Sequence, residues 1–384
     1  MKKNKTLCRA LLISLLALAM LLPSCNDAVT PEGDDTTVAD TTTSADTTAA
    51  DTTVADTTTA ESTTTSSTPS TVTPEGNARL TVVTYNIQSQ YLGVNYGYRE
   101  KNVAKVISEI YADVYCLQEC GEQWLSSNAE KRYDKLNEAM KGYTLVTRTT
   151  GMTDEPDDFI YYNANTLTLI DGGWYKLMDD GEVINGTKCK HPRYVSFAVF
   201  EHKDTSKQFL VLNTHLDNSG ESVRSKQVEI MYDYIETELV QYKSLPMILC
   251  GDMNSDAPGG NYDVGNAFKK LNNGTYFTYA KQRSGVTFVA KDKPKFKYNS
   301  GFAFTLINHA FRCEFPNNKT AEDFAQSRGL GGMDKRILDA IFVSDDITPT
   351  KYSVIYRNFA KTEGYWKYAS DHMPVVCEMY LALD

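Results

Sequence analysis

Met247-Ile248-Leu249-Cys250-Gly251-Asp252-Met253-Asn254 joins a short apolar run to a polar end. Four apolar residues bounded by a glycine are typical of a strand buried on both faces. Asp252 and Asn254 follow two residues apart, so their side chains project to the same side if the extended geometry continues. An Asx turn after the glycine is the alternative. The stretch predicts a buried strand that ends in paired polar groups.

The same pattern, a buried strand followed at once by polar residues, recurs along the chain. Asn86, Glu119 and His215 each follow an apolar run with strand character. Strands are expected at residues 80–85, 114–117, 144–147, 159–162, 194–200, 209–213, 247–250, 339–343 and 375–381. Helical spacing of apolar residues predicts helices at 103–111, 128–140, 224–239 and, more weakly, 262–270.

Many strands with a few helices between them predict a mixed α/β domain. We expect a four-layer α/β/β/α sandwich, in which two packed mixed β-sheets are flanked by helices. Strand ends in such folds gather at one edge. The polar residues that follow the strands are therefore expected to converge there.

The first 24 residues have the basic start and the apolar run of a secretory signal. The apolar run is too short for a comfortable membrane span. It ends in Leu22-Pro23-Ser24-Cys25, which resembles a bacterial lipobox with Cys25 as the lipidated residue. This predicts a lipid anchor on the extracellular face of the cell envelope. Ordinary signal cleavage and free secretion are the alternative.

Residues 25–76 are rich in Thr, Ser, Ala and Asp and offer almost nothing to bury, which predicts a disordered stalk. A single folded domain is then expected at residues 77–384. Without the four cations of residues 1–24 and the ten acids of residues 25–76, 35 basic and 39 acidic residues remain, a net charge of −4. A duplex-binding protein usually carries a basic excess. The charge therefore argues against strong non-specific affinity for DNA.

The cysteines of the domain do not form a zinc pattern, because Cys116 and Cys120 have no second pair with the spacing of a zinc site. Cys116, Cys250 and Cys377 lie in apolar runs and are expected to be buried free thiols. Cys189 and Cys313 lie in more polar stretches, so a disulfide between them stays open.

Several short motifs follow one another in the order seen in the endonuclease/exonuclease/phosphatase superfamily, which the domain resembles over about residues 80–381. They are Tyr85-Asn86-Ile87, Leu117-Gln118-Glu119, Asn213-Thr214-His215-Leu216-Asp217, Gly251-Asp252-Met253-Asn254, Leu338-Asp339-Ala340-Ile341-Phe342 and Ser370-Asp371-His372. Any one of them can arise by chance, but the ordered set is a strong signal. The resemblance implies a metal-dependent hydrolase of phosphoesters.

A hard cation such as Mg²⁺ or Mn²⁺ prefers carboxylate and amide oxygens. Glu119 is the first candidate ligand, with Asn86 as an amide ligand or phosphate contact and Asp371 as a ligand through water. The resemblance implies that Asp252 orients and deprotonates the attacking water and that Asn254 holds a phosphate oxygen. A turn-forming role for Asn86 and a solvated acid at Glu119 are the simpler alternatives.

The two histidines of the motifs are expected to do different work. His372 should donate to a phosphoryl oxygen while Asp339 accepts from its other ring nitrogen. His215 should lie on the leaving-group side as a phosphate donor or general acid.

Three further residues are candidates for substrate binding, namely Asn213, Arg193 and Arg224. Asn213 opens the motif that contains His215. Arg193 follows His191-Pro192 and could reach substrate. Arg224 could clamp a phosphate, although pairing with Glu221 at the start of a helix is an equal alternative.

About 85 residues separate Asn254 from Asp339, and the extra material at 275–332 alternates aromatic and basic residues. Such a segment could bind single strands or sugar rings, and it could equally pack as an extra hairpin. We favour the hairpin.

The leading hypothesis is a monomeric, membrane-tethered, metal-dependent phosphohydrolase or phosphodiesterase acting on an extracellular phosphoester. A secreted nuclease that degrades DNA or RNA is the alternative. A catalytically silent surface-binding module is a third reading, but it predicts the loss of key polar residues, and all six principal ones are present. They are Glu119, His215, Asp252, Asn254, Asp339 and His372.

Overall fold

The computed structural model describes residues 77–88, 96–120, 134–146, 156–259, 262–283, 285–291, 336–355, 369–370 and 372–382. The chain divides into two units, residues 1–65 and 66–384, and all described residues lie in the second. The signal and stalk expected at 1–24 and 25–76, with Cys25, lie outside the described residues. In the part of the chain that the structure describes, no helix is both long and apolar enough to cross a membrane.

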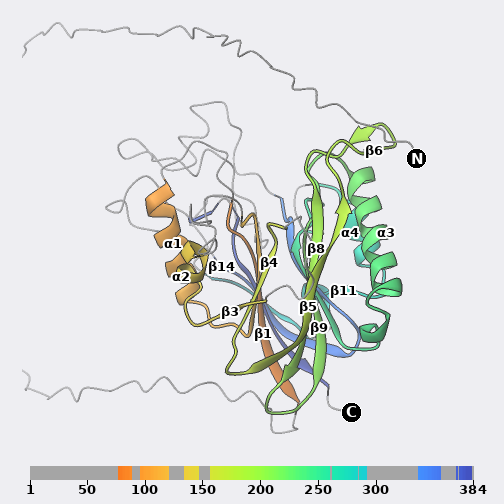
Figure 1. Cartoon of the computed structure of the whole chain (residues 1–384). Helices are drawn as coiled ribbons and strands as arrows, with labels where there is room; N and C mark the ends of the chain where they lie inside the picture. Colours follow the sequence, from red (N-terminus) through yellow and green to blue (C-terminus); the bar gives the residue numbers. More distant parts are fainter. Residues whose placement is uncertain are drawn as a thin grey trace, which may run out of the picture. The chain divides into compact units, whose positions relative to one another are not determined.

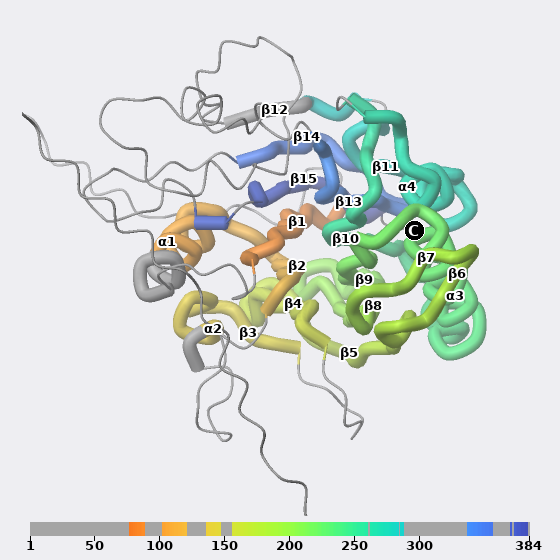
Figure 2. Tube along the Cα trace, turned by 90° about the horizontal axis from the view of Figure 1, so that it is seen from above, coloured from red at the N-terminus to blue at the C-terminus, as the bar shows by residue number. Residues whose placement is uncertain are grey.

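Two mixed sheets pack face to face. Figure 2, a view from above, shows the strands of the two sheets as two neighbouring rows. The seven-stranded sheet has the order β12-β14-β15-β1-β2-β4-β3 and the six-stranded sheet the order β11-β13-β10-β9-β8-β5. The strands of the first are β1 (Ala78–Asn86), β2 (Val114–Gln118), β3 (Thr144–Leu145), β4 (Phe159–Tyr162), β12 (Thr287–Lys291), β14 (Ile347–Ile355) and β15 (Val375–Leu381). Those of the second are β5 (Leu167–Met178), β8 (Arg193–His202), β9 (Gln208–His215), β10 (Met247–Asp252), β11 (Thr278–Tyr279) and β13 (Asp339–Val343).

Helices cover the outer face of each sheet (Figure 1). On the seven-stranded sheet, the apolar side of α1 (Tyr96–Ser108) packs with α2 (Asp134–Ala139) over Tyr115 and Leu117. On the six-stranded sheet lie α3 (Glu221–Thr237) and α4 (Asn266–Leu271). The smaller elements are the hairpin β6 (Val183–Ile184) with β7 (Thr187–Lys188) and the 3₁₀ turns η3 (Val240–Tyr242) and η4 (Ala280–Gln282). The four-layer α/β/β/α sandwich expected from the sequence is confirmed.

The main core fills the space between the two sheets. Val82, Val114 and Cys116 contribute from one sheet, and Leu212 and Cys250 from the other, all fully buried. Such near-continuous apolar strands follow from burial on both faces. The cysteines expected to be buried free thiols are so, as are Cys120 and Cys189. Cys313 lies outside the described residues.

Strand direction brings the polar ends to one edge. β1 and β2 are parallel, as are β9 and β10, so each pair ends at the same level. β13 and β15 are antiparallel to β10 and β1, so they begin where those strands end. The two sheets are joined at this edge by Gln118 Nε2, which donates to Asn213 Oδ1 at 2.7 Å.

Several elements differ from the sequence-based expectation. β5 and β14 were not expected, because β5 contains Gly172-Gly173 and β14 contains Pro349, residues that weaken a strand pattern. Both strands carry bulges next to these positions. α1 begins at Tyr96, earlier than the expected residue 103, and the expected start of α2 at 128–133 lies outside the described residues.

The beginning of the 275–332 segment packs onto the domain. Phe277 and Tyr279 are each 1% exposed, and the ring of Tyr279 contacts Phe342 and Tyr352. β12 then pairs in parallel with β14. The aromatic residues of this part therefore pack onto the domain, but the expected hairpin is wrong for the described residues, because β11 pairs with β13 and β12 pairs in parallel with β14. The rest of the segment lies outside the described residues.

Candidate active site

The polar strand ends meet at one edge of the sandwich. Asp252 at the end of β10 lies in register with His215 at the end of β9 and with Asp339 at the start of β13. Asn86 ends β1 beside the end of β2, which Glu119 follows directly. Residues separated by up to 253 positions in the sequence therefore come together, as the motif order implied.

Two carboxylates converge on the side-chain amide of Asn86. Its Nδ2 donates to Glu119 Oε1 and to Asp252 Oδ2, both at 3.0 Å, and its Oδ1 accepts from the N–H of Gln88 at 2.9 Å. Glu119 has a φ of 59°, a left-handed conformation that costs free energy in a residue other than glycine. Such strain persists where the surroundings hold a side chain in one place, and the Glu119 carboxylate is held against the Asn86 amide.

The turn after β10 sets the positions of Asp252 and Asn254. The N–H of Asn254 donates to Asp252 Oδ1 at 2.9 Å, the bond of an Asx turn, and Asn254 has a φ of 46°. Asp252 and Asn254 therefore form an Asx turn and also lie together at the site. Gly251 has a φ of +156°, and a Cβ there would lie 2.0 Å from the carbonyl oxygen of Thr214. Only glycine allows β10 to approach β9 so closely.

His372 and Asp339 form the buried pair expected from the motifs. The ring Nδ1 of His372 lies 2.8 Å from Asp339 Oδ2, and its Nε2 lies 3.6 Å from Asp252 Oδ2. Ser370 Oγ accepts from the N–H of His372 at 3.1 Å and donates to the carbonyl of Asn86 at 2.7 Å. The carboxylate therefore orients the ring, and the serine ties this loop to the end of β1. Asp371, between them, lies outside the described residues.

His215 faces the same carboxylate from the other side. Its Nε2 lies 3.5 Å from Asp252 Oδ2 and 2.9 Å from Asn254 Nδ2. Burial, followed by the positive charge of Arg193, lowers the pKa of His215 well below its usual value. The ring is therefore neutral at pH 7, which suits a hydrogen-bonding partner of the phosphate better than a general acid.

Two overlapping sets of donors could hold a metal. One ligand atom each from Asp252, Asp339 and His372 lies within 4.8 Å of the others. However, His372 and Asp339 are already bonded to each other. Glu119 and Asp252 offer carboxylate oxygens to either side of the Asn86 amide, and carboxylate and amide oxygens are the donors that Mg²⁺ and Mn²⁺ prefer. These residues fit a hard divalent cation.

Arg193 lies at the site end of β8 and is 5% exposed. Its Nε is 3.8 Å from Asp217 Oδ2, too far for a hydrogen bond. The oxygens of Asp217 accept instead from backbone N–H groups of Lys190, His191 and Ser219 at 2.8 to 3.1 Å. The Arg193 guanidinium therefore lies near the site, and its Nε is not hydrogen-bonded to Asp217.

Arg224 and Asn213 are engaged by protein groups. Arg224 donates to Glu221 Oε1 from Nε and Nη2 at 3.1 and 2.8 Å, and to the carbonyl of Asp217 from Nη1 at 2.9 Å. Asn213 Nδ2 donates to the carbonyls of Leu117 and Phe159. The structure thus shows the pairing alternative for Arg224, and Asn213 bridges the sheets. Substrate contacts by either residue stay a prediction.

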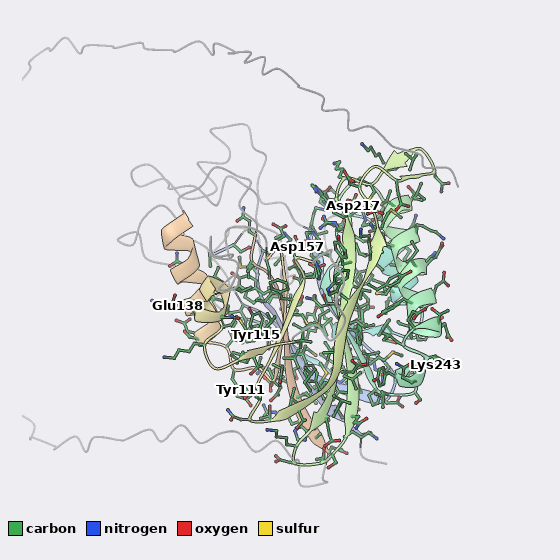
Figure 3. The ribbon with its side chains drawn as sticks, in the orientation of Figure 1. Tyr111, Tyr115, Glu138, Asp157, Asp217 and Lys243 are labelled. Atoms are coloured by element: carbon green, nitrogen blue, oxygen red, sulfur yellow. The ribbon has the colours of Figure 1, made fainter. Side chains whose placement is uncertain are left out.

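Two acids that sequence reasoning left unassigned also lie at this edge. Asp157 and Asp158 precede β4, which runs antiparallel to β2, so its start lies at the level where β2 ends. Figure 3 shows Asp157 and Asp217 at the same end of the sheets, opposite Tyr111. Burial is the main cause that raises the pKa of Asp157 and of Asp158, and the charge of Asp157 raises the pKa of Asp158 further. An acidic pair directly before an apolar strand was the available signal, but its meaning depends on strand direction.

The sequence and the fold match known proteins. Residues 83–372 match the sequence model of the Endonuclease/Exonuclease/phosphatase family. A curated relative, the CCR4-Not complex 3'-5'-exoribonuclease subunit Ccr4 of Kluyveromyces lactis, is 24% identical over 188 residues. That alignment covers 42% of this chain and 24% of the relative, so the chain matches about a quarter of the relative's length.

Solved structures share the fold. An endonuclease/exonuclease/phosphatase family protein from Bacteroides thetaiotaomicron has a TM-score of 0.57 and 22% identity, covering 80% of this chain and 99% of that one. A mannosyl-6-phosphatase from the same organism has a TM-score of 0.55 and 23% identity, covering 78% and 99%. At these identities the likeness concerns the fold.

Proposed function

Because the chain belongs to the endonuclease/exonuclease/phosphatase family of phosphoester hydrolases, we propose that it hydrolyses phosphate esters outside the cell with a divalent cation, Mg²⁺ or Mn²⁺. The observation that carries the proposal is the convergence of Glu119 and Asp252 on Asn86, each at 3.0 Å. The buried pair of His372 and Asp339 lies against the same Asp252 carboxylate.

Glu119 and Asn86 would hold the cation, with Asp371 as a further ligand through water. A bound divalent cation supplies positive charge that offsets the negative oxygens of the phosphate. The Asn86 amide now directs N–H groups at both carboxylates; rotation by half a turn would present its oxygen.

Asp252 is the proposed general base. Its Oδ1 is taken by the N–H of Asn254, while its Oδ2 faces both catalytic histidines and Asn86. The oxygen of the attacking water bonds to phosphorus as the ester P–O bond breaks, the proton of the water passes to this carboxylate, and the leaving alcohol oxygen takes its proton from solvent. His372, oriented by Asp339, donates to a phosphoryl oxygen and stabilises the charge that builds there. Asn254 and neutral His215 bind the phosphate from the other side.

The substrate is proposed to be a small extracellular phosphoester rather than duplex nucleic acid. The expected catalytic domain is close to neutral, and acids rather than a basic stripe lie beside the site. A nuclease is the second candidate, favoured by the match to a 3'-5'-exoribonuclease subunit. Nicking of plasmid DNA at low salt would favour that candidate.

The test of the chemistry is hydrolysis of bis-p-nitrophenyl phosphate and p-nitrophenyl phosphate by the full chain with Mg²⁺ or Mn²⁺. EDTA should abolish activity and added metal should restore it. Asp252→Ala and His372→Ala should each lower kcat by about 100-fold or more. Asp204→Ala, in the exposed turn between β8 and β9, is the matched control. EDTA-resistant activity, or full activity in Asp252→Ala, contradicts the proposal.

The location is proposed from the signal and the lipobox-like sequence at Cys25. Lipidation at Cys25 would tether the domain through the stalk as a monomer outside the membrane. Labelling with radioactive palmitate should mark the wild-type chain in the membrane fraction. Cys25→Ser should remove the label and release the enzyme into the medium.

A further inference from the structure

Three buried polar side chains with unpartnered atoms lie at the site edge of the sandwich. Asp158 precedes β4, Arg193 begins β8 and His215 ends β9, and they are 1%, 5% and 4% exposed. Among the residues that the structure describes, Nε of Arg193 and Nδ1 of His215 have no hydrogen-bond partner, and no group lies in hydrogen-bonding geometry with either carboxylate oxygen of Asp158, although the backbone N–H of His215 is close enough to lower its pKa. A buried polar atom without a partner costs about 1–3 kcal/mol. Their presence together indicates that something outside the protein completes them.

These groups belong to one neighbourhood. The guanidinium of Arg193 acts electrostatically on Asp157, Asp158 and His215, and Asp157 acts on Asp158. Glu119 is also within electrostatic reach of both acids. The cluster therefore borders the catalytic residues, on the side of the site where His215 stands.

The backbone around the cluster is fixed. Ser196 Oγ of β8 donates to the carbonyl oxygen of Asp158 at 2.6 Å, which ties the start of β4 to the other sheet. Cys120 N–H donates to the carbonyl oxygen of Asp157 at 2.8 Å. The acids are thus presented from rigid strand ends, as binding groups are.

The chemistry of the cluster selects its ligand. Carboxyl groups accept hydrogen bonds and the guanidinium only donates them, so a group that both donates and accepts completes both. A hydroxyl does so. A second phosphate would instead meet two acids with only one compensating cation.

We propose that Asp157, Asp158 and Arg193 form a subsite for the alcohol part of the substrate, and that this part is a polyhydroxy compound, a sugar or polyol that carries the phosphate. The inference rests on the proposed function and specifies its substrate class. The subsite selects substrate and takes no part in cleaving the ester.

The test compares two alkyl phosphates with chemically similar leaving groups, glucose 6-phosphate and n-butyl phosphate. For the wild-type full chain with Mg²⁺, kcat/KM should be higher for glucose 6-phosphate. In Arg193→Ala the ratio of the two kcat/KM values should fall by about 10- to 100-fold, as loss of a hydrogen bond to a charged group predicts. In Asp158→Ala the ratio should fall by about 2- to 10-fold, as loss of an ordinary hydrogen bond predicts. Asp158→Asn should retain part of the ratio, and Asp204→Ala all of it.

The outcomes separate this proposal from the proposed function. Absence of metal-dependent hydrolysis of any phosphoester by the wild type overturns the function. If the wild type hydrolyses glucose 6-phosphate no better than n-butyl phosphate, the subsite is wrong and the proposed function stands. The same holds if the variants lower kcat/KM for both substrates by the same factor. Cleavage of an oligonucleotide in preference to both alkyl phosphates also overturns it. If Asp158→Ala does not fold, Asp157→Ala is judged by the same ratio.

Discussion

The two ends of the sandwich carry buried acids in opposite states. At the end away from the site, Asp113 precedes β2, and its carboxylate accepts from Thr81 N–H at 2.7 Å, Thr166 Oγ1 at 2.8 Å and Tyr111 OH at 3.1 Å. At the site end, no described group lies in hydrogen-bonding geometry with the Asp158 carboxylate, although the backbone N–H of His215 lowers its pKa, and two carboxylates share the amide of Asn86.

The difference distinguishes buried polar groups that are paired within the protein from buried polar groups that are available to a ligand. The three hydrogen bonds to Asp113 offset part of the cost of removing its carboxylate from water, although burial still raises its pKa. Acids that crowd together or lack donors destabilise the fold and are retained where a ligand completes them. Substitutions at the two ends should therefore affect activity and stability in opposite proportions.

The largest effect is expected from Asp252→Asn at the site end. Loss of the proposed general base should lower kcat about 100- to 10,000-fold. The free energy of unfolding should change little or rise, because one of the two carboxylates that crowd Asn86 is neutralised. Steady-state kinetics and urea denaturation on the same preparation measure both quantities. A large loss of stability would mean that Asp252 is structural.

A smaller loss of activity is expected from Asp339→Asn. Asp339 acts through His372, whose Nδ1 it holds at 2.8 Å, so kcat should fall about 10- to 100-fold. KM should change less than kcat, and the pH profile of kcat should shift, because the carboxylate that stabilises a protonated ring is gone. An unchanged pH profile would contradict this positioning role.

The opposite behaviour is expected from Asp113→Ala. Three donors lose their acceptor, so the free energy of unfolding should fall by about 2–4 kcal/mol. The folded variant should keep its kcat, since the residue lies at the far end. Urea denaturation compared with Asp204→Ala measures the change. Lost activity in the folded variant would show that the two ends are coupled.

The smallest effect concerns pH. His202, fully buried near Asp113, has its pKa lowered by burial, partly offset by Asp113 and Asp204. Below about pH 6.5 the unfolded chain takes up a proton that the folded ring resists, so this residue makes stability fall as the pH falls. In His202→Gln the free energy of unfolding should fall less between pH 7.5 and pH 5.5 than it does in the wild type, by a difference of less than about 1 kcal/mol. Urea denaturation of both proteins at the two pH values measures this difference. An equal change in the free energy of unfolding in wild type and variant would contradict the prediction.

Much of the fold was predictable where local pattern and tertiary burial agree. The bounds of β4, β13 and β15 match the expected residues, because each is an apolar run closed by turn or polar residues. β5 was missed because it is an edge strand whose outer face is exposed and whose centre is Gly172-Gly173. A Cβ at Gly172 would lie 2.5 Å from Val146 Cγ1, so the glycine that hides the strand is required by its packing.

The sequence by itself determined which side chains stand at the strand ends. Glu119, His215, Asp252 and Asn254 follow apolar runs, and Asp339 and His372 lie in two separate motifs that resemble the family. Only the tertiary structure decided their partners. Strand order and direction place Asp252 between His215 and Asp339 and bring Asp157 and Asp158 to the same edge. The physical reason is that residue periodicity records which faces are buried, whereas contacts between distant segments depend on how the sheets pair.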